Sequence, residues 1–121
     1  MEKNILMGSL LDIYGELLPE KQRMLIDMAC NADLSLSEIS ETQGITRQGV
    51  HDRIRRGELQ LSAYEESLHL LEKKRARVKL LRDLQIMIDK SLAELEEDPA
   101  AARKHLEAAA KTAAGLLQKE E

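Results

Sequence analysis

The chain has 121 residues, and its 18 basic and 22 acidic side chains give a formal charge of −4 at neutral pH. General nucleic-acid binders carry a basic overall charge, so any binding of nucleic acid by this chain would need a local basic patch. The single cysteine, Cys30, excludes an intramolecular disulfide bond and a multi-cysteine zinc site.

The composition predicts an all-α protein. The chain has no Phe or Trp and only two prolines, and its many Leu, Ala, Glu, Lys and Arg residues favour long helices with charged outer faces. β-Branched residues, which favour strands, are few and scattered. Apolar residues recur at spacings of three and four along the chain. The expected helices cover residues 3–17, 19–31, 35–42, 47–72, 75–97 and 99–118.

The first expected helix carries an apolar stretch from Ile5 to Leu18, which Asp12 and Glu16 interrupt. Signal peptides and membrane spans do not carry such charges at their centre. We therefore expect a cytoplasmic protein without a membrane segment. Pro19 follows directly and suits the first position of the second helix.

Residues 35–56 have the pattern of a helix-turn-helix motif. Ser35 and Glu38 have the spacing of a capping box at the start of the first helix of the motif. Gly44 can take the left-handed backbone conformation that the turn needs. Thr46 can cap the second helix through its hydroxyl. These separate signals agree with one another, so they predict the motif together.

The second helix of the motif has one apolar and one polar face. Val50 and Ile54 are four residues apart and point inward, which leaves basic and polar side chains outside. Arginine and glutamine suit bidentate contacts with guanine and adenine edges, and further arginines can reach phosphates. The other interpretation is that this face is simply solvated, or docks a protein or RNA. The candidate nucleic-acid-binding residues are Arg47, Gln48, His51, Arg53, Arg55 and Arg56.

The helical pattern continues beyond the motif to Asp98. Gly57 is the expected place for a helix end or kink, because glycine costs about 1 kcal/mol in a helix interior. A leucine stripe in this region resembles a coiled-coil seam, and we interpret it as a dimer interface, the inner face of a helical hairpin, or both. The residues assigned to dimerisation are Leu61, Tyr64, Leu68, Leu71, Leu81, Ile88 and Leu92. We divide the chain into a helix-turn-helix domain, residues 1–62, and a helical extension for dimerisation, residues 63–121.

The remaining residues give weaker signals. The basic run from Lys73 to Lys79 could grip RNA or a phosphate backbone, although such runs are more often a solvated helix face. No cluster of His, Cys and Asp has metal-ligand spacing, and no nucleophile is paired with a base. We expect no enzymatic activity, no metal and no cofactor.

Four pieces of the sequence are distinctive: LPEKQR at 18–23, SLSEI at 35–39, TRQGV at 46–50 and Tyr64–Glu65. On these pieces, residues 4–97 resemble the YlxM family of Gram-positive bacteria, whose helix-turn-helix is similar to region 4 of sigma-70 factors and is winged-helix-like. The resemblance implies a helical, dimeric protein encoded beside the signal-recognition-particle GTPases, with a regulatory part in that targeting pathway.

Three residues depart from the family pattern. Gln43 stands where the family prefers an apolar residue, Ser40 replaces the usual alanine at a close helix contact, and Gly49 replaces the usual alanine in the recognition helix. We expect all three to loosen the helix-turn-helix.

These observations leave two hypotheses for the function. The first is a homodimeric regulatory protein that binds duplex DNA and takes part in the signal-recognition-particle pathway. The alternative is an adaptor that binds signal-recognition-particle RNA or its GTPases and never touches DNA.

Overall fold

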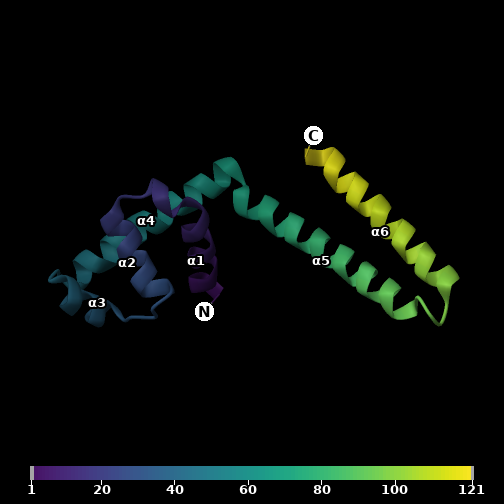
Figure 1. Cartoon of the computed structure of the whole chain (residues 1–121). Coiled ribbons are helices and arrows are strands. Elements are labelled where there is room, and N and C mark those ends of the chain that lie inside the picture. Colours follow the sequence, from purple (N-terminus) through teal and green to yellow (C-terminus); the bar gives the residue numbers. More distant parts are fainter. Residues whose placement is uncertain (1, 121) are drawn as a thin grey trace. The chain divides into compact units, whose positions relative to one another are not determined.

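The computed structural model describes residues 2–120, and over that range every regular element is a helix. The elements are α1 (Glu2–Tyr14), a 3-10 helix η1 (Gly15–Leu17), α2 (Glu20–Cys30), α3 (Leu36–Gln43), α4 (Arg47–Leu68), α5 (Leu70–Glu94) and α6 (Pro99–Glu120), as Figure 1 shows. The predicted all-α class is confirmed. Between residues 2 and 120, no helix combines the length and the apolar character that crossing a lipid bilayer requires.

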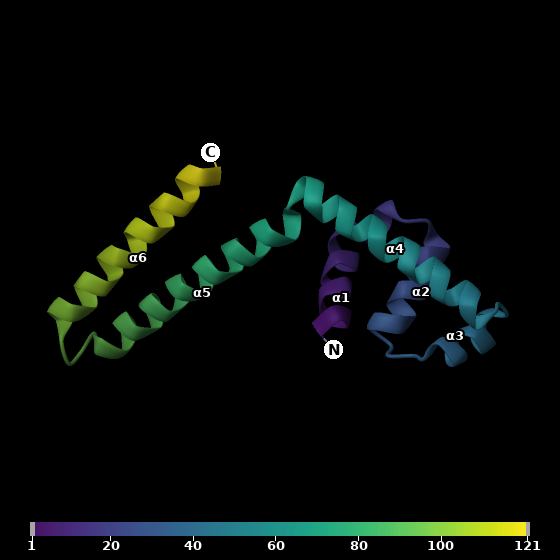
Figure 2. The same cartoon turned by 180° about the vertical axis from the view of Figure 1, so that it is seen from behind.

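The chain divides into two compact units, Met1–Lys73 and Lys74–Glu121. In the first unit, α1, α2 and α3 each contact α4, which is the longest helix of that unit (Figures 1 and 2). The boundary that we expected at residue 62 falls inside α4. The first unit reaches further along the chain because Leu61 and Leu71 both belong to its core.

The core of the first unit is almost entirely aliphatic, as the composition requires. Leu25, Ile26, Ile39 and Leu61 are fully buried, and the ring of Tyr14 is only 1% exposed. Burying a side chain of this size stabilises a fold by roughly 1.5–3 kcal/mol. The core therefore depends on a small number of well-packed leucines and isoleucines from α1, α2, α3 and α4.

The expectation that Gly57 ends or kinks a helix is wrong. α4 continues through Gly57 to Leu68, and Gly57 is buried against α2. A Cβ atom added at Gly57 would lie 2.5 Å from Cδ1 of Ile26. The glycine is therefore explained by the close approach of two helices, which needs the absence of a side chain.

The helix breaks instead at His69, which takes the left-handed conformation with φ 55° and ψ 31°. The carboxylate of Glu65 accepts hydrogen bonds from the backbone N–H groups of Leu71 and Glu72, at 2.9 and 3.1 Å. These N–H groups are in the first turn of α5 and have no partner within that helix. A side chain of α4 thus caps the next helix, and α5 begins at Leu70 rather than at the predicted residue 75.

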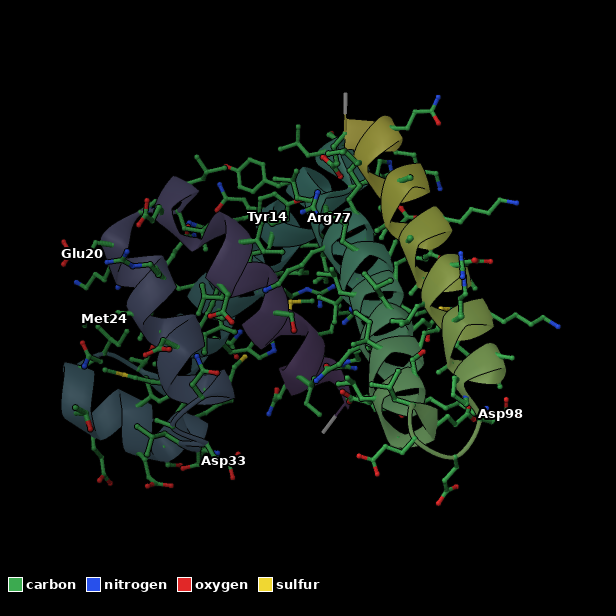
Figure 3. The ribbon with its side chains drawn as sticks, turned by 45° about the vertical axis from the view of Figure 1, so that its right-hand side comes forward. Tyr14, Glu20, Met24, Asp33, Arg77 and Asp98 are labelled. Carbon is green, nitrogen blue, oxygen red and sulfur yellow. The ribbon has the colours of Figure 1, made fainter. Side chains whose placement is uncertain are left out.

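In the second unit, α5 and α6 form an antiparallel hairpin, with Asp98 in the connecting turn (Figures 1 and 3). The Oδ1 atom of Asp98 accepts the N–H of Ala101 at 3.1 Å, which caps α6 at the predicted start. Small side chains are buried in this hairpin: Ser91 on α5, and Ala102 and Ala109 on α6. The unit therefore has little apolar core of its own.

Candidate nucleic-acid interface

The predicted helix-turn-helix is formed by α3, the turn after it, and the first half of α4. The Ser35 hydroxyl accepts the N–H of Glu38 at 3.1 Å, and the Glu38 carboxylate accepts the N–H of Ser35 at 3.3 Å. Gly44 ends α3 in the left-handed conformation, with φ 66° and ψ 30°. The Thr46 hydroxyl then accepts the N–H of Gly49 at 3.0 Å and caps α4. Each capping signal in the sequence is therefore present in the structure.

Two of the departures from the family pattern make side-chain contacts of their own. The Ser40 hydroxyl donates a hydrogen bond to the carbonyl oxygen of Ile45, which ties α3 to the far side of the turn. Gln43 reaches the sulfur of Met28 with its Nε2, a weak contact at 3.8 Å. We expected Ser40 to weaken the helix contact, and that expectation missed the acceptor on the opposite side of the turn.

The inner face of α4 anchors the motif to the core of the first unit. Val50 is fully buried and Ile54 is 9% exposed, as the four-residue spacing predicts. Ile39, on α3, is fully buried in the same cluster. Because these side chains fix the rotation of α4 about its axis, the side chains of its outer face point away from the core.

Most of the predicted contact residues lie on that outer face. Arg47, His51 and Arg55 are exposed and follow one another at four-residue spacing, so they form a single row along the helix. At 1.5 Å per residue the row is about 12 Å long. Gln48 and Arg56 are also exposed. The helix therefore presents a continuous polar face over its first two turns.

Arg53 was assigned to phosphate contacts, but the structure places it differently. Its side chain is half-buried, and its Nη1 atom is buried without a hydrogen-bond partner among residues 2–120. Arg53 is four residues before Gly57 and therefore lies on the same side of the helix, which faces α2. Spacing alone does not settle a position between the two faces of an amphipathic helix, so the phosphate contact assigned to Arg53 stays a prediction.

Two features of this face were missed in the sequence. Gln48 donates a hydrogen bond from Nε2 to Oδ1 of Asp52 at 2.9 Å, and Nδ1 of His51 lies 3.6 Å from the same oxygen. A hollow of about 430 Å³ also opens beside Gln48, between the starts of α3 and α4. Its lining residues are Leu36, Arg47, Gln48 and His51. The four-residue spacing of Gln48 and Asp52 was the available signal for the hydrogen bond.

The leucine stripe assigned to dimerisation is divided between two environments. Leu61 and Leu71 are buried in the core of the first unit, where they complete its packing. The partly buried ring of Tyr64 packs against Tyr14, with ring centroids 5.9 Å apart. These three side chains are therefore used inside one chain. The exposed members of the stripe are Leu68, Leu81, Ile88 and Leu92.

The basic side chains of the run from Lys73 to Lys79 lie on α5 and are exposed, as is Arg82. The Nη1 atom of Arg77 lies 3.9 Å from Oε1 of Glu120. Exposed ion pairs with this separation between nitrogen and oxygen contribute little to stability. The run therefore forms a positively charged helix surface.

The fold and this face define the class of the molecule: it is an all-α protein with a helix-turn-helix. A family model described as "Putative helix-turn-helix protein, YlxM / p13 like" matches residues 1–99. The chain belongs to this family, which is also called UPF0122.

Individual relatives agree with the family model. A UPF0122 protein of Clostridium kluyveri is 51% identical over 75 residues, which cover 62% of this chain and 68% of the relative. One from Oceanobacillus iheyensis is 46% identical and covers 72% of this chain and 83% of its own length. One from Symbiobacterium thermophilum is 40% identical over 99 residues, 82% of this chain and 87% of the relative. The family match ends at residue 99, where α6 begins.

Proposed function

We propose that the protein is a regulatory protein that binds duplex DNA with the outer face of α4, and that it is not an enzyme. The observation that carries this proposal is the exposed row of Arg47, His51 and Arg55, held outward by the buried residues Val50 and Ile54. A recognition helix in the major groove uses this arrangement of an anchored inner face and a polar outer face.

The residues of the face have different roles in this proposal. Gln48, at the start of α4, reads a base edge, because the first residues of a recognition helix contact bases. Arg55 and Arg56 contact phosphates on either side of the groove. The net charge of −4 limits the electrostatic attraction to this patch. Non-specific binding is therefore weak and fades above physiological salt.

The test is a salt titration of duplex-DNA binding by the full chain, measured by fluorescence anisotropy. We expect the logarithm of the association constant to fall linearly with the logarithm of the salt concentration. A slope corresponding to two to four phosphate contacts per subunit would match the exposed arginines on α4, Arg47, Arg55 and Arg56. No binding to duplex DNA at low salt would overturn the proposal.

A second function is favoured by the exposed basic surface of α5. It is an adaptor role in which Lys74, Arg75 and Lys79 bind signal-recognition-particle RNA or an acidic surface of its GTPases. The same titration, with this RNA and these GTPases in place of DNA, separates the two functions. An adaptor binds them equally well after Gln48→Ala and His51→Ala, whereas a reader of duplex DNA loses its preferred site.

We further propose that the protein acts as a homodimer through the second unit. Leu81 and Leu92 on α5 are 58% and 64% exposed, and Leu117 on α6 is 61% exposed. A hairpin with so little core gains stability when a second copy covers these side chains. A two-fold dimer also doubles the contact with DNA, which one short helix-turn-helix needs for useful affinity.

A further inference from the structure

Asp52 occupies an unfavourable place for a residue of a DNA-binding face. Its side chain is 56% exposed on the outer side of α4, where a negative charge repels a phosphate backbone. Its Oδ1 atom accepts a hydrogen bond from Nε2 of Gln48 at 2.9 Å. A carboxylate can only accept, so the nitrogen of the glutamine amide must face Asp52 and its oxygen must face away. The hydrogen bond therefore sets the direction of the whole amide group.

The atoms that Asp52 leaves unused match the edge of adenine. A glutamine amide has two N–H donors and one oxygen acceptor, and Asp52 takes one of the donors. The second N–H and the Oε1 atom remain, and these are the pair that contacts adenine at N7 and N6 in the major groove. Guanine presents two acceptors there, N7 and O6, and would meet the outward oxygen of Gln48 unfavourably. The held amide thus favours adenine over guanine.

The surroundings give a base edge access to this amide. Gln48 lines the hollow of about 430 Å³ together with Leu36, Arg47 and His51. The hollow opens between the starts of α3 and α4, and the start of α4 is the part of a helix-turn-helix that contacts bases. Gln48 is therefore both oriented by Asp52 and open to an incoming group.

We propose that Asp52 is a positioning residue that fixes Gln48 to read the adenine of an A·T base pair. This inference rests on the proposed binding of duplex DNA. Ordering a flexible side chain costs binding affinity, and holding it in advance recovers about twofold to tenfold. A correctly made bidentate contact discriminates between bases by about fivefold to 150-fold.

The experiment begins with selection of a preferred duplex from a random library by the full chain. Dissociation constants are then measured for that duplex and for duplexes in which each A·T pair is replaced by G·C. The proteins are the wild type, Gln48→Ala, Asp52→Asn and Asp52→Ala, each checked for helix content. Asp52→Asn and Asp52→Ala remove the same charge, but only asparagine keeps an oxygen that can accept from Gln48.

We expect Gln48→Ala to lose discrimination at one A·T pair and at no other. At that pair Asp52→Ala loses about twofold to tenfold of the discrimination, whereas Asp52→Asn retains it. Both variants bind the duplex that lacks this A·T pair more tightly, because a repelling charge has been removed. Combining Gln48→Ala with Asp52→Ala adds no further loss of discrimination, because the two residues act as one unit.

Two results would overturn the inference while leaving DNA binding intact. The first is equal discrimination in Asp52→Ala and Asp52→Asn, which would make the hydrogen bond a surface contact within the helix. The second is an unchanged base preference in Gln48→Ala. A wild-type chain that binds no duplex at all would instead remove the proposed function itself.

Discussion

The hydroxyl of Tyr14 donates a hydrogen bond to Oε1 of Glu65 at 2.7 Å and accepts the N–H of Leu70 at 3.1 Å. Glu65 in turn accepts the N–H groups of Leu71 and Glu72. Two side chains that are 51 residues apart in sequence thus satisfy the backbone donors at the start of α5. The end of α4 and the start of α5 are therefore tied to α1 by a buried tyrosine.

Tyr14→Phe removes both hydrogen bonds of the hydroxyl and keeps the ring in the core. We expect a melting temperature several degrees below that of the wild type, because one donor and one acceptor lose their partner. We also expect faster hydrogen exchange at the amide of Leu70. Tyr64→Phe is the matched control, because it removes the hydroxyl of the neighbouring ring and leaves this network in place. Equal melting temperatures for the two variants would contradict the role of Tyr14.

The same network predicts how stability depends on acid. The hydrogen bond from Tyr14, followed by those from the N–H groups of Leu71 and Glu72, holds the pKa of Glu65 below its usual value of 4.5. A depressed pKa in the folded state contributes stability that is present above pH 4.5 and is lost as the pH falls through the folded-state pKa. Glu65→Gln removes this titration. We expect the difference in melting temperature between the two proteins to be constant near neutral pH.

Below about pH 4.5 that difference should narrow, because the wild-type carboxylate becomes protonated. Thermal unfolding followed by circular dichroism between pH 3 and pH 7 measures the melting temperatures of the wild type and Glu65→Gln. A difference that stays the same down to pH 3 would show that Glu65 titrates alike in the folded and unfolded chains.

Gly57→Ala tests the close approach of α2 and α4. The new Cβ would lie 2.5 Å from Cδ1 of Ile26, which is fully buried and has little room to move. Overpacking of this kind costs about 1–3 kcal/mol, partly offset by the better helix propensity of alanine. Ile26→Val removes the Cδ1 atom, so the double variant should recover part of the loss.

Gly115→Ala is the control for this prediction. Gly115 is also inside a helix, α6, but an added Cβ meets no atom within 4 Å. This variant should gain roughly 0.5–1 kcal/mol in the free energy of unfolding. Urea titration measures the free energy of unfolding of Gly57→Ala and Gly115→Ala. A Gly57→Ala variant more stable than the wild type would refute the packing explanation.

The helices and their caps could be predicted from the sequence because these signals are local. Ser35, Gly44 and Thr46 act on neighbours within four residues, and the structure shows each of them at its predicted helix end. The break at His69 could not be predicted, because the side chains that satisfy the N–H groups after it include Tyr14 from another helix. The continuation of α4 through Gly57 could not be predicted either, because it depends on the close approach of Ile26 from α2.

The sequence also predicted part of the candidate interface, namely which side of α4 is exposed. The four-residue spacing of Val50 and Ile54 established which face of α4 is buried, and hence the exposure of Arg47 and Arg55. Arg53 lies at the border between the two faces, where only the position of α2 decides whether a side chain is covered. The spacing of residues along α4 gives no information on where α2 packs.

Arg55→Ala and Arg53→Ala form a matched pair that tests this difference. Arg55 is exposed, so its loss should weaken binding to every duplex and lower the slope of the salt dependence by about one per subunit. Arg53→Ala should leave the slope unchanged, because the Nη1 atom of Arg53 is buried. Salt titration of duplex binding measures both. A lower slope for Arg53→Ala alone would place the phosphate contact on the other side of α4.

The last prediction concerns self-association through the second unit. Leu81, Ile88 and Leu92 follow one another at spacings of seven and four, so they lie on one side of α5, and all three are exposed. Leu92→Glu would place a charge in the proposed dimer interface and should convert the dimer to a monomer. Ile86 is equally exposed, at 63%, but it lies on another side of the helix. Ile86→Glu should therefore leave the dimer intact.

Multi-angle light scattering on the full chain measures the mass of each variant. The two substitutions introduce the same charge into the same helix, so only the position on the helix differs. The first unit keeps its own core in both, because neither residue belongs to it. A monomeric wild type at tens of micromolar would refute the dimer, and dissociation by Ile86→Glu would move the interface to another side of α5.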